Sequence, residues 1–170
     1  SNHPPYVIPP YFHPHSDVLE EQIVEYADWS IRQFMQAAEK QPWFDNTIFV
    51  FLGDHGKMVG TPECEMPQSY NHIPLMIYGK DIKPGVYDGF GGQVDVSPTL
   101  LGLLNISYLQ NNFGVNLLEE ERPCMFFTAD NLIGARDSVN MFIYSPDSQQ
   151  EFKYKLEEGK LHAATGTDEE

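Results

Sequence analysis

The sequence predicts an α/β protein built on a mixed sheet, with a small antiparallel β appendage at its C-terminal end. One amphipathic helix and two short apolar runs alternate in the first half of the chain, as they do where helices pack on a sheet. The apolar runs are rich in β-branched and aromatic residues, which is typical of buried strands. In the last third, shorter apolar stretches are separated by turn sequences, as in hairpins.

The first expected element is a helix that follows a proline-rich stretch. Five prolines fall within the first fifteen residues, so we expect that stretch to be extended. Asp17 and Glu20 have the spacing of a capping box at a helix N-terminus. Apolar residues then recur at helical spacing as far as Ala38, and Pro42 ends the pattern.

Two apolar runs follow this helix and are expected to be strands. Residues 47–52 form a continuous run, which favours a strand buried on both faces in the middle of a sheet. Residues 73–78 form the second run, and Pro74 indicates an edge position or the start of a strand. A long loop rich in polar residues, Gly and Pro separates the two.

The rest of the chain is expected to hold one short helix and several strands. Ser97 and Pro98 have the form of an N-cap and a first helical residue, which predicts a helix over residues 99–104. Three further strands are predicted, at residues 124–129, 139–144 and 152–156.

The composition excludes several classes of function. The chain of 170 residues has 10 basic and 25 acidic residues, which gives a net charge of −15. Without clustered Lys and Arg it offers no surface for phosphate backbones, so we expect no nucleic-acid partner and no attraction to anionic membranes. No run approaches the roughly 18 apolar residues of a membrane span, and we expect no membrane contact from this segment itself.

Cysteine usage says little about the cellular compartment. Cys64 and Cys124 are the two cysteines, and neither belongs to a C-x-x-C zinc or redox pattern. They could form a disulfide only if folding brought them together.

The first apolar run ends in residues suited to bind a cation. Asp54 and His55 follow it directly, and ligands of open α/β sheets gather at the carboxyl ends of strands. A carboxylate oxygen and an imidazole nitrogen are common ligands of divalent cations. Gly53 and Gly56 flank the pair and leave room for an ion. Two ligands do not complete a site, so on these residues alone a structural turn with a hydrogen-bonded Asp is the alternative interpretation.

Two further histidines lie near the expected edge of the sheet. His72 directly precedes the second apolar run, and His3 lies in the proline-rich N-terminal segment. Each alone is also compatible with an ordinary surface or core histidine. Taken together with other motifs, in their order along the chain, the two histidines indicate a function more strongly than either does alone.

Five motifs, in this order and at this spacing, carry a family resemblance: S-N-H-P-P-Y at residues 1–6, Y-A-D at 26–28, T-I-F-V-F-L-G-D-H-G at 47–56, N-H-I-P-L at 71–75 and Q-V-D-V-S-P-T-L-L-G-L-L at 93–104. The sequence resembles the C-terminal part of the sulfatase-type catalytic domain of the alkaline phosphatase superfamily, near its lipoteichoic acid synthase and phosphoethanolamine transferase branch. The resemblance covers about residues 1–104 well and the remainder loosely.

This resemblance implies a three-layer α/β/α sandwich with a mixed, largely parallel sheet, of which the chain would hold an incomplete half. Residues 1–108 would form the metal-site half of that portion, and residues 109–170 the C-terminal strands and tail. It also implies that the parent protein lies outside the cytoplasm, in the periplasm or at the cell surface, anchored by membrane helices upstream.

The resemblance assigns roles to single residues. Asp54 and His55 match ligands of a divalent cation, zinc or manganese, with calcium or magnesium as the choice of a true sulfatase. His3 matches a histidine that contacts the group being transferred or its second metal, and His72 matches one with a similar role on the opposite side. These two are the predicted catalytic residues. Asp95 corresponds to a commonly retained residue that we expect to cap a helix rather than bind metal.

The implied function is the transfer or hydrolysis of phosphoryl or sulfuryl esters, by a phosphoglycerol or phosphoethanolamine transferase or a sulfatase. The covalent intermediate would form on an upstream Thr, Ser or formylglycine, and neither Cys64 nor Cys124 meets the formylglycine pattern C-x-[PS]-x-R. We therefore expect the chain alone to be inactive and to bind metal weakly.

The expected partners are the missing N-terminal half of the domain and a substrate that is a small-molecule, lipid head-group or glycan ester. Whether that ester is a sulfate or a phosphate stays open at this level. The alternative function is a non-catalytic module with the sulfatase fold that binds a glycan or a partner protein.

Overall fold

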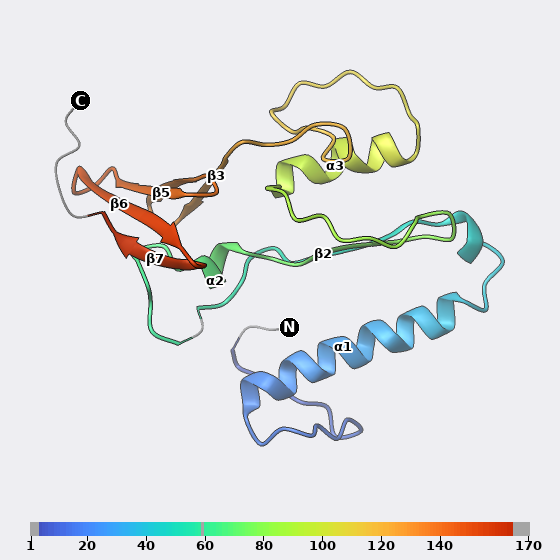
Figure 1. The fold of residues 1–170 in the computed structure, drawn as a ribbon. Coiled ribbons are helices and arrows are strands. Elements are labelled where there is room, and N and C mark those ends of the chain that lie inside the picture. Colours follow the sequence, from blue (N-terminus) through green and yellow to red (C-terminus); the bar gives the residue numbers. More distant parts are fainter. Residues whose placement is uncertain (1–3, 59, 165–170) are drawn as a thin grey trace. The chain divides into compact units, whose positions relative to one another are not determined.

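The computed structural model describes residues 4–58 and 60–164 (Figure 1). The chain divides into two compact units, one formed by Ser1–Val50 with Ile77–Lys83 and the other by Phe51–Met76 with Pro84–Glu170. The division passes through β1 (Phe49–Leu52) and β2 (Leu75–Tyr78), which pair in a two-stranded sheet. His3, one of the two predicted catalytic residues, lies outside the described residues.

The first unit is organised around α1 (Leu19–Ala38). The predicted capping box at Asp17 is wrong, because the helix begins later and its N-cap is Val18, which has no capping side chain. The chain before the helix is held instead by Glu25, whose carboxylate accepts the backbone N–H groups of His15 at 2.7 Å and Ser16 at 3.0 Å.

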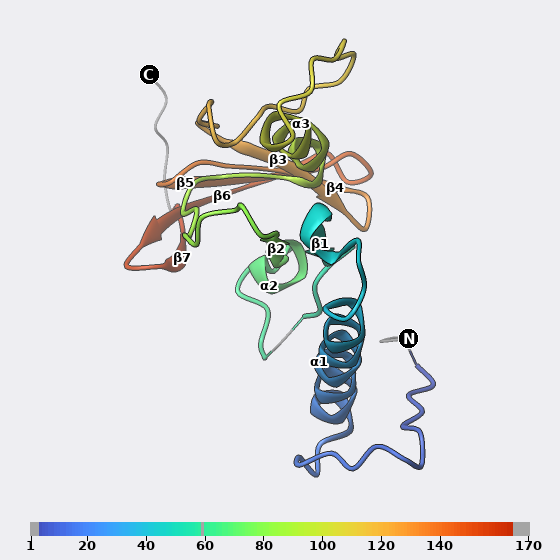
Figure 2. The same cartoon turned by 90° about the vertical axis from the view of Figure 1, so that its right-hand side faces the viewer.

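Aromatic rings fix the proline-rich stretch to α1, beside which it turns back (Figure 2). Tyr11 and Phe12 each pack against Tyr26 and Trp29, with ring centroids between 5.2 and 6.5 Å apart. Such pairs add about 0.5–1.5 kcal/mol each beyond the area they bury. The stretch therefore has a defined position on the helix although it has no regular structure of its own.

A second aromatic group surrounds Phe49 of β1, which is 7% exposed. Four rings lie around it, those of Phe34, Trp43, Phe44 and Tyr78. Both predicted early strands are confirmed, but the expectation that the first is buried on both faces is wrong, since Leu52 is 42% exposed. Among the described residues β2 is the only strand paired with β1, so the other edge of β1 has no strand partner.

The second unit contains α2 (Gln68–Asn71) and α3 (Gln93–Leu103). The predicted helix start at Ser97 and Pro98 is wrong, because α3 begins earlier and both residues lie inside it. Pro98 has no N–H to donate to the carbonyl of Val94. Gly114 lies against that carbonyl instead, so closely that a Cβ on Gly114 would come within 2.1 Å of it.

The C-terminal strands form a five-stranded antiparallel meander, with each strand paired to the next in sequence (Figure 1). Asp130 and Asn131 in its first turn have φ angles of 49° and 62°, as a type I′ hairpin requires. The strands are β3 (Met125–Ala129), β4 (Leu132–Arg136), β5 (Asn140–Ser145), β6 (Gln150–Glu157) and β7 (Lys160–Ala163). The predicted strands correspond to β3, β5 and β6, and β4 and β7 were not predicted. The α/β class and the antiparallel C-terminal part are thus confirmed.

The core of the second unit lies against one face of this meander. Met141 and Ile143 of β5 are buried there together with Cys64 and Met66 from the loop between β1 and β2. Cys64 and Cys124 are both free, so the disulfide considered from the sequence is absent. None of the helices in residues 4–58 and 60–164 is long and apolar enough to cross a membrane.

Candidate functional site

The loop that carries Asp54 and His55 follows β1 and is held by backbone hydrogen bonds on both sides. The N–H of Gly53 donates to the carbonyl of Pro74 at 3.3 Å, and the N–H of Gly56 donates to that of Tyr70 at 2.8 Å. A Cβ on Gly56 would lie 2.1 Å from the Ser69 carbonyl oxygen. Glycine is therefore required at position 56 because the backbone of α2 passes so close.

The two predicted metal ligands face each other. Asp54 Oδ1 accepts the backbone N–H of His55 at 2.9 Å, and Asp54 Oδ2 lies 4.0 Å from His55 Nε2. His55 Nδ1 is 2.8 Å from the carbonyl oxygen of Gly56, which can only accept, so Nδ1 donates and a neutral ring has its lone pair on Nε2. The Asp54 side chain is 90% exposed and that of His55 is 40% exposed.

This arrangement fits a divalent cation. Two ligands of a tetrahedral ion, bound at about 2.0–2.1 Å, lie roughly 3.3 Å apart, so a small rotation of the exposed carboxylate would bring the pair to that spacing. A hydrogen bond from the other ring nitrogen to a carbonyl is also the usual way in which a metal-binding histidine is oriented. The pair supplies two ligands, and the part of the chain that the structure describes holds no group of three or more His, Cys, Asp or Glu placed for a metal.

His72 is attached to the same loop through α2. Tyr70, in α2, stacks on the ring of His55 with centroids 5.5 Å apart and planes inclined by 22°. His72 is the C-cap of α2, its backbone N–H donates to the Gln68 carbonyl at 2.8 Å, and its side chain is exposed. The short helix therefore supports His55 with one residue and presents His72 with another.

The meander in turn holds α2 and the loop before it. The guanidinium of Arg136 on β4 donates to the side-chain oxygen of Gln68, and Tyr154 on β6 donates to Glu65 at 2.5 Å. Burial and then the bond to Glu65 raise the pKa of Tyr154, so the phenol keeps its proton and remains a donor. Neither contact follows from a motif, because the partners are far apart in sequence.

Asp95 caps α3, as predicted, and is fully buried. It accepts the N–H groups of Gly92 and Val115 at 2.8 Å and two hydrogen bonds from the guanidinium of Arg122. Burial alone would raise the pKa of Asp95, but the bonds from Arg122, Val115 and Gly92 outweigh it and the pKa is lowered. The carboxylate is thus occupied by the protein and is not placed to bind a metal.

Sequence reasoning missed Gln93, the first residue of α3. Its side-chain Nε2 donates to the carbonyls of Gly53 at 3.2 Å and Asp54 at 2.8 Å. Nothing in the sequence distinguishes this glutamine from an ordinary surface residue. This contact joins the start of α3 to the loop that carries the predicted metal ligands.

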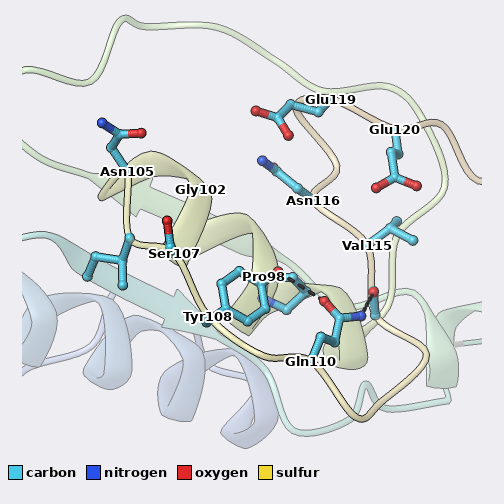
Figure 3. Close-up of a pocket in the computed structure, with 12 residues that line it drawn as sticks. Pro98, Gly102, Asn105, Ser107, Tyr108, Gln110, Val115, Asn116, Glu119 and Glu120 are labelled. Atoms are coloured by element: carbon cyan, nitrogen blue, oxygen red, sulfur yellow. Dashed lines mark hydrogen bonds between the residues drawn. The ribbon is translucent and has the colours of Figure 1, made fainter.

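A cavity of about 430 Å³ lies at the other end of α3 (Figure 3). Asn105, Asn116, Glu119 and Glu120 line it with polar groups. Asp54, His55 and His72 are not among the described residues that line it, so it is separate from the Asp54–His55 loop.

The sulfatase family model matches residues 2–106, which is more than half of the chain. The chain belongs to the sulfatase family. The family predicted from the sequence is therefore confirmed, and with it the membership of a family of enzymes.

Relatives of this sulfatase-family chain include both lipoteichoic acid synthases and sulfatases by name. Lipoteichoic acid synthase 1 of Bacillus subtilis is 28% identical over 155 residues, which cover 82% of the chain and 24% of that protein. Choline-sulfatase of Rhizobium meliloti is 29% identical over 121 residues, 63% of the chain and 22% of that protein. The chain spans about a quarter of the length of these curated relatives.

A solved structure has the same fold. The crystal structure of a protein in the alkaline phosphatase superfamily from Vibrio parahaemolyticus superposes with a TM-score of 0.82 at 24% identity, over 98% of this chain and 42% of that one. The α/β architecture predicted from the sequence is thus also that of a known member of the superfamily.

Proposed function

We propose that this chain contributes the metal-binding part of an active site that transfers or hydrolyses phosphoryl or sulfuryl esters. The observation that carries the proposal is the Asp54–His55 pair at the end of β1, with Oδ2 and Nε2 facing each other at 4.0 Å on a braced backbone. Membership of the sulfatase family supports the proposal, because transfer or hydrolysis of such esters is the first activity to expect of a member.

In this proposal Asp54 Oδ2 and His55 Nε2 hold the cation, which is zinc or manganese in a phosphotransferase and calcium or magnesium in a true sulfatase. When bound, the cation would neutralise charge on the ester oxygens as a Lewis acid. His55 keeps its Nδ1 proton on the Gly56 carbonyl and so keeps its orientation. His72 and His3 donate hydrogen bonds or protons to the oxygens of the group being transferred.

The nucleophile of the proposed reaction is a Thr, Ser or formylglycine that precedes residues 1–6 in the parent protein. Cys64 is not a substitute, because burial raises the pKa of its thiol to about 11. The protonated thiol donates a hydrogen bond to the Met66 carbonyl at 3.0 Å. A thiol with so high a pKa forms little thiolate at neutral pH and is a poor nucleophile. We therefore propose that the 170 residues alone do not turn over substrate.

The proposed substrate is a small-molecule, lipid head-group or glycan ester, with a phosphate ester favoured over a sulfate. The S-N-H-P-P-Y and N-H-I-P-L motifs support this preference, and so does the similarity to lipoteichoic acid synthase 1 over 82% of the chain. We further propose that the parent protein acts outside the cytoplasm and is anchored in the membrane by helices upstream.

Metal titration tests the proposal. Isothermal titration of the chain with Mn²⁺ and Zn²⁺ is expected to show weak binding, and Asp54→Asn and His55→Ala should each weaken it by at least about tenfold, since each removes one of few ligands. Asp28→Asn, at an exposed position in α1, controls for unspecific attraction to the chain's charge of −15. Equal affinities of all four proteins would contradict the assignment.

The same protein tests the assignment of the nucleophile. Incubation with a chromogenic phosphodiester or a chromogenic sulfate ester and either metal should give no turnover. Turnover by the chain alone that survives purification would show that it carries its own nucleophile.

A further inference from the structure

We propose that Gln93 is a positioning residue for the Asp54–His55 pair, and this inference rests on the function proposed for that pair. The side-chain amide of Gln93 donates to the backbone carbonyls of Gly53 and Asp54, at 3.2 and 2.8 Å. These carbonyls belong to the two peptide groups on either side of the Asp54 Cα. Holding both peptide planes fixes the direction of the Cα–Cβ bond between them.

This restraint acts where the side chain itself has little support from packing. The Asp54 side chain is 90% exposed, so packing against neighbouring side chains contributes little to its position. The held backbone therefore contributes to its orientation. The second held peptide also contains the His55 N–H, which donates to Asp54 Oδ1 at 2.9 Å, so the same restraint reaches the second predicted ligand.

The donor stands on a rigid support. Gln93 is the first residue of α3, and two residues later Asp95 is fully buried, with both oxygens bonded to Arg122 and to backbone N–H groups. This buried ion pair fixes the start of the helix. The hydrogen bonds of Gln93 thus hold the loop at the start of α3, across a sequence separation of about forty residues.

Glutamine is well suited to this task. A single Nε2 carries two hydrogens, one for each carbonyl. Glu would direct an acceptor at two other acceptors, and Lys would bring a positive charge toward the proposed cation. Asn is shorter by one C–C bond, roughly 1.5 Å, which is enough to break both hydrogen bonds.

The test uses the full chain with Gln93→Met, which keeps length and removes the donor, and Gln93→Asn, which keeps the amide and removes the reach. Ser97→Ala, at an exposed position of the same helix, is the control. In metal-free protein, the carbonyl ¹³C shifts of Gly53 and Asp54 should move in both Gln93 variants and not in the control. Mn²⁺ affinity should fall about tenfold in both, as when a partner of a metal ligand is removed.

The outcomes separate this inference from the function on which it rests. Unchanged carbonyl shifts, or Mn²⁺ affinities within twofold of the wild type for folded Gln93 variants, would overturn the role of Gln93 if Asp54→Asn and His55→Ala still weaken binding by at least about tenfold. If Asp54→Asn and His55→Ala bind Mn²⁺ like the wild type, or if the wild type binds none, the proposed site itself fails and the inference with it. Circular dichroism spectra confirm that each variant is folded.

Discussion

One aspartate lies near the start of α3 and another follows the end of β1, and the two have opposite environments. Asp95 is 0% exposed and accepts hydrogen bonds from Arg122, Gly92 and Val115, whereas the side chain of Asp54 is 90% exposed on a braced backbone. A carboxylate whose oxygens are occupied by the protein holds the fold together. One that faces outward from a fixed backbone is suited to bind something from solution.

The largest expected effect comes from breaking the buried pair. Arg122→Met leaves the Asp95 carboxylate buried without its counter-charge, which typically costs about 3–5 kcal/mol of the free energy of unfolding. The matched control is Arg32→Met, whose partner Asp28 lies in an exposed pair and which should change the stability little. Urea denaturation measures both. Similar losses in the two variants would mean that the α3 pair is not a special support.

A smaller loss of stability is expected from Gly56→Ala, in the loop that follows β1. The new Cβ would meet the Ser69 carbonyl oxygen at 2.1 Å, so α2 must shift, and overpacking of this kind costs about 1–3 kcal/mol. Gly85→Ala is the control, since no atom lies within 4 Å of the position its Cβ would take. Denaturation midpoints and Mn²⁺ titrations should both respond to Gly56→Ala. A variant as stable as Gly85→Ala would show that the loop is not braced by α2.

The smallest expected effect is a dependence on pH that belongs to Asp95. Because its folded pKa is lowered, the stability it contributes is fully present above its unfolded pKa of about 3.9 and is lost as the pH falls through the folded value. The difference in free energy of unfolding between the wild type and Asp95→Asn should therefore shrink on acidification below about pH 4. A difference that stays constant down to pH 2 would contradict the lowered pKa.

Elements with strong local patterns were predictable from the sequence, and those fixed by distant contacts were not. The apolar runs that became β1 and β2 were found because their composition leaves few alternatives. The start of α3 was misplaced because Ser97 and Pro98 imitate a helix N-terminus, while the real N-cap, Gly92, works through Asp95 and Arg122. β4 contains Gly134 in its middle and so lacked the apolar alternation of a strand.

The residues of the candidate site divide in the same way, into those that could be named from the sequence and those that could not. Asp54 and His55 could be named from the sequence because they follow a strand in a D-H-G motif, and the structure places their side chains face to face. Their supports could not be named, since Gln93, Tyr70 and Arg136 act through contacts that depend on the folded chain. The metal-binding roles of Asp54 and His55 and the catalytic roles of His3 and His72 stay predictions.

The meander has a consequence for the order in which the chain folds. Every strand from β3 to β7 pairs with its neighbour in sequence, so its contacts are local and close only short loops. The contacts that shape the candidate site instead span 40 residues from Gln93 to Gly53, 68 from Arg136 to Gln68 and 89 from Tyr154 to Glu65. Chain entropy therefore favours early formation of the meander. We expect the loop that carries Asp54 and His55 to take its final shape after the meander, on a template that is already folded.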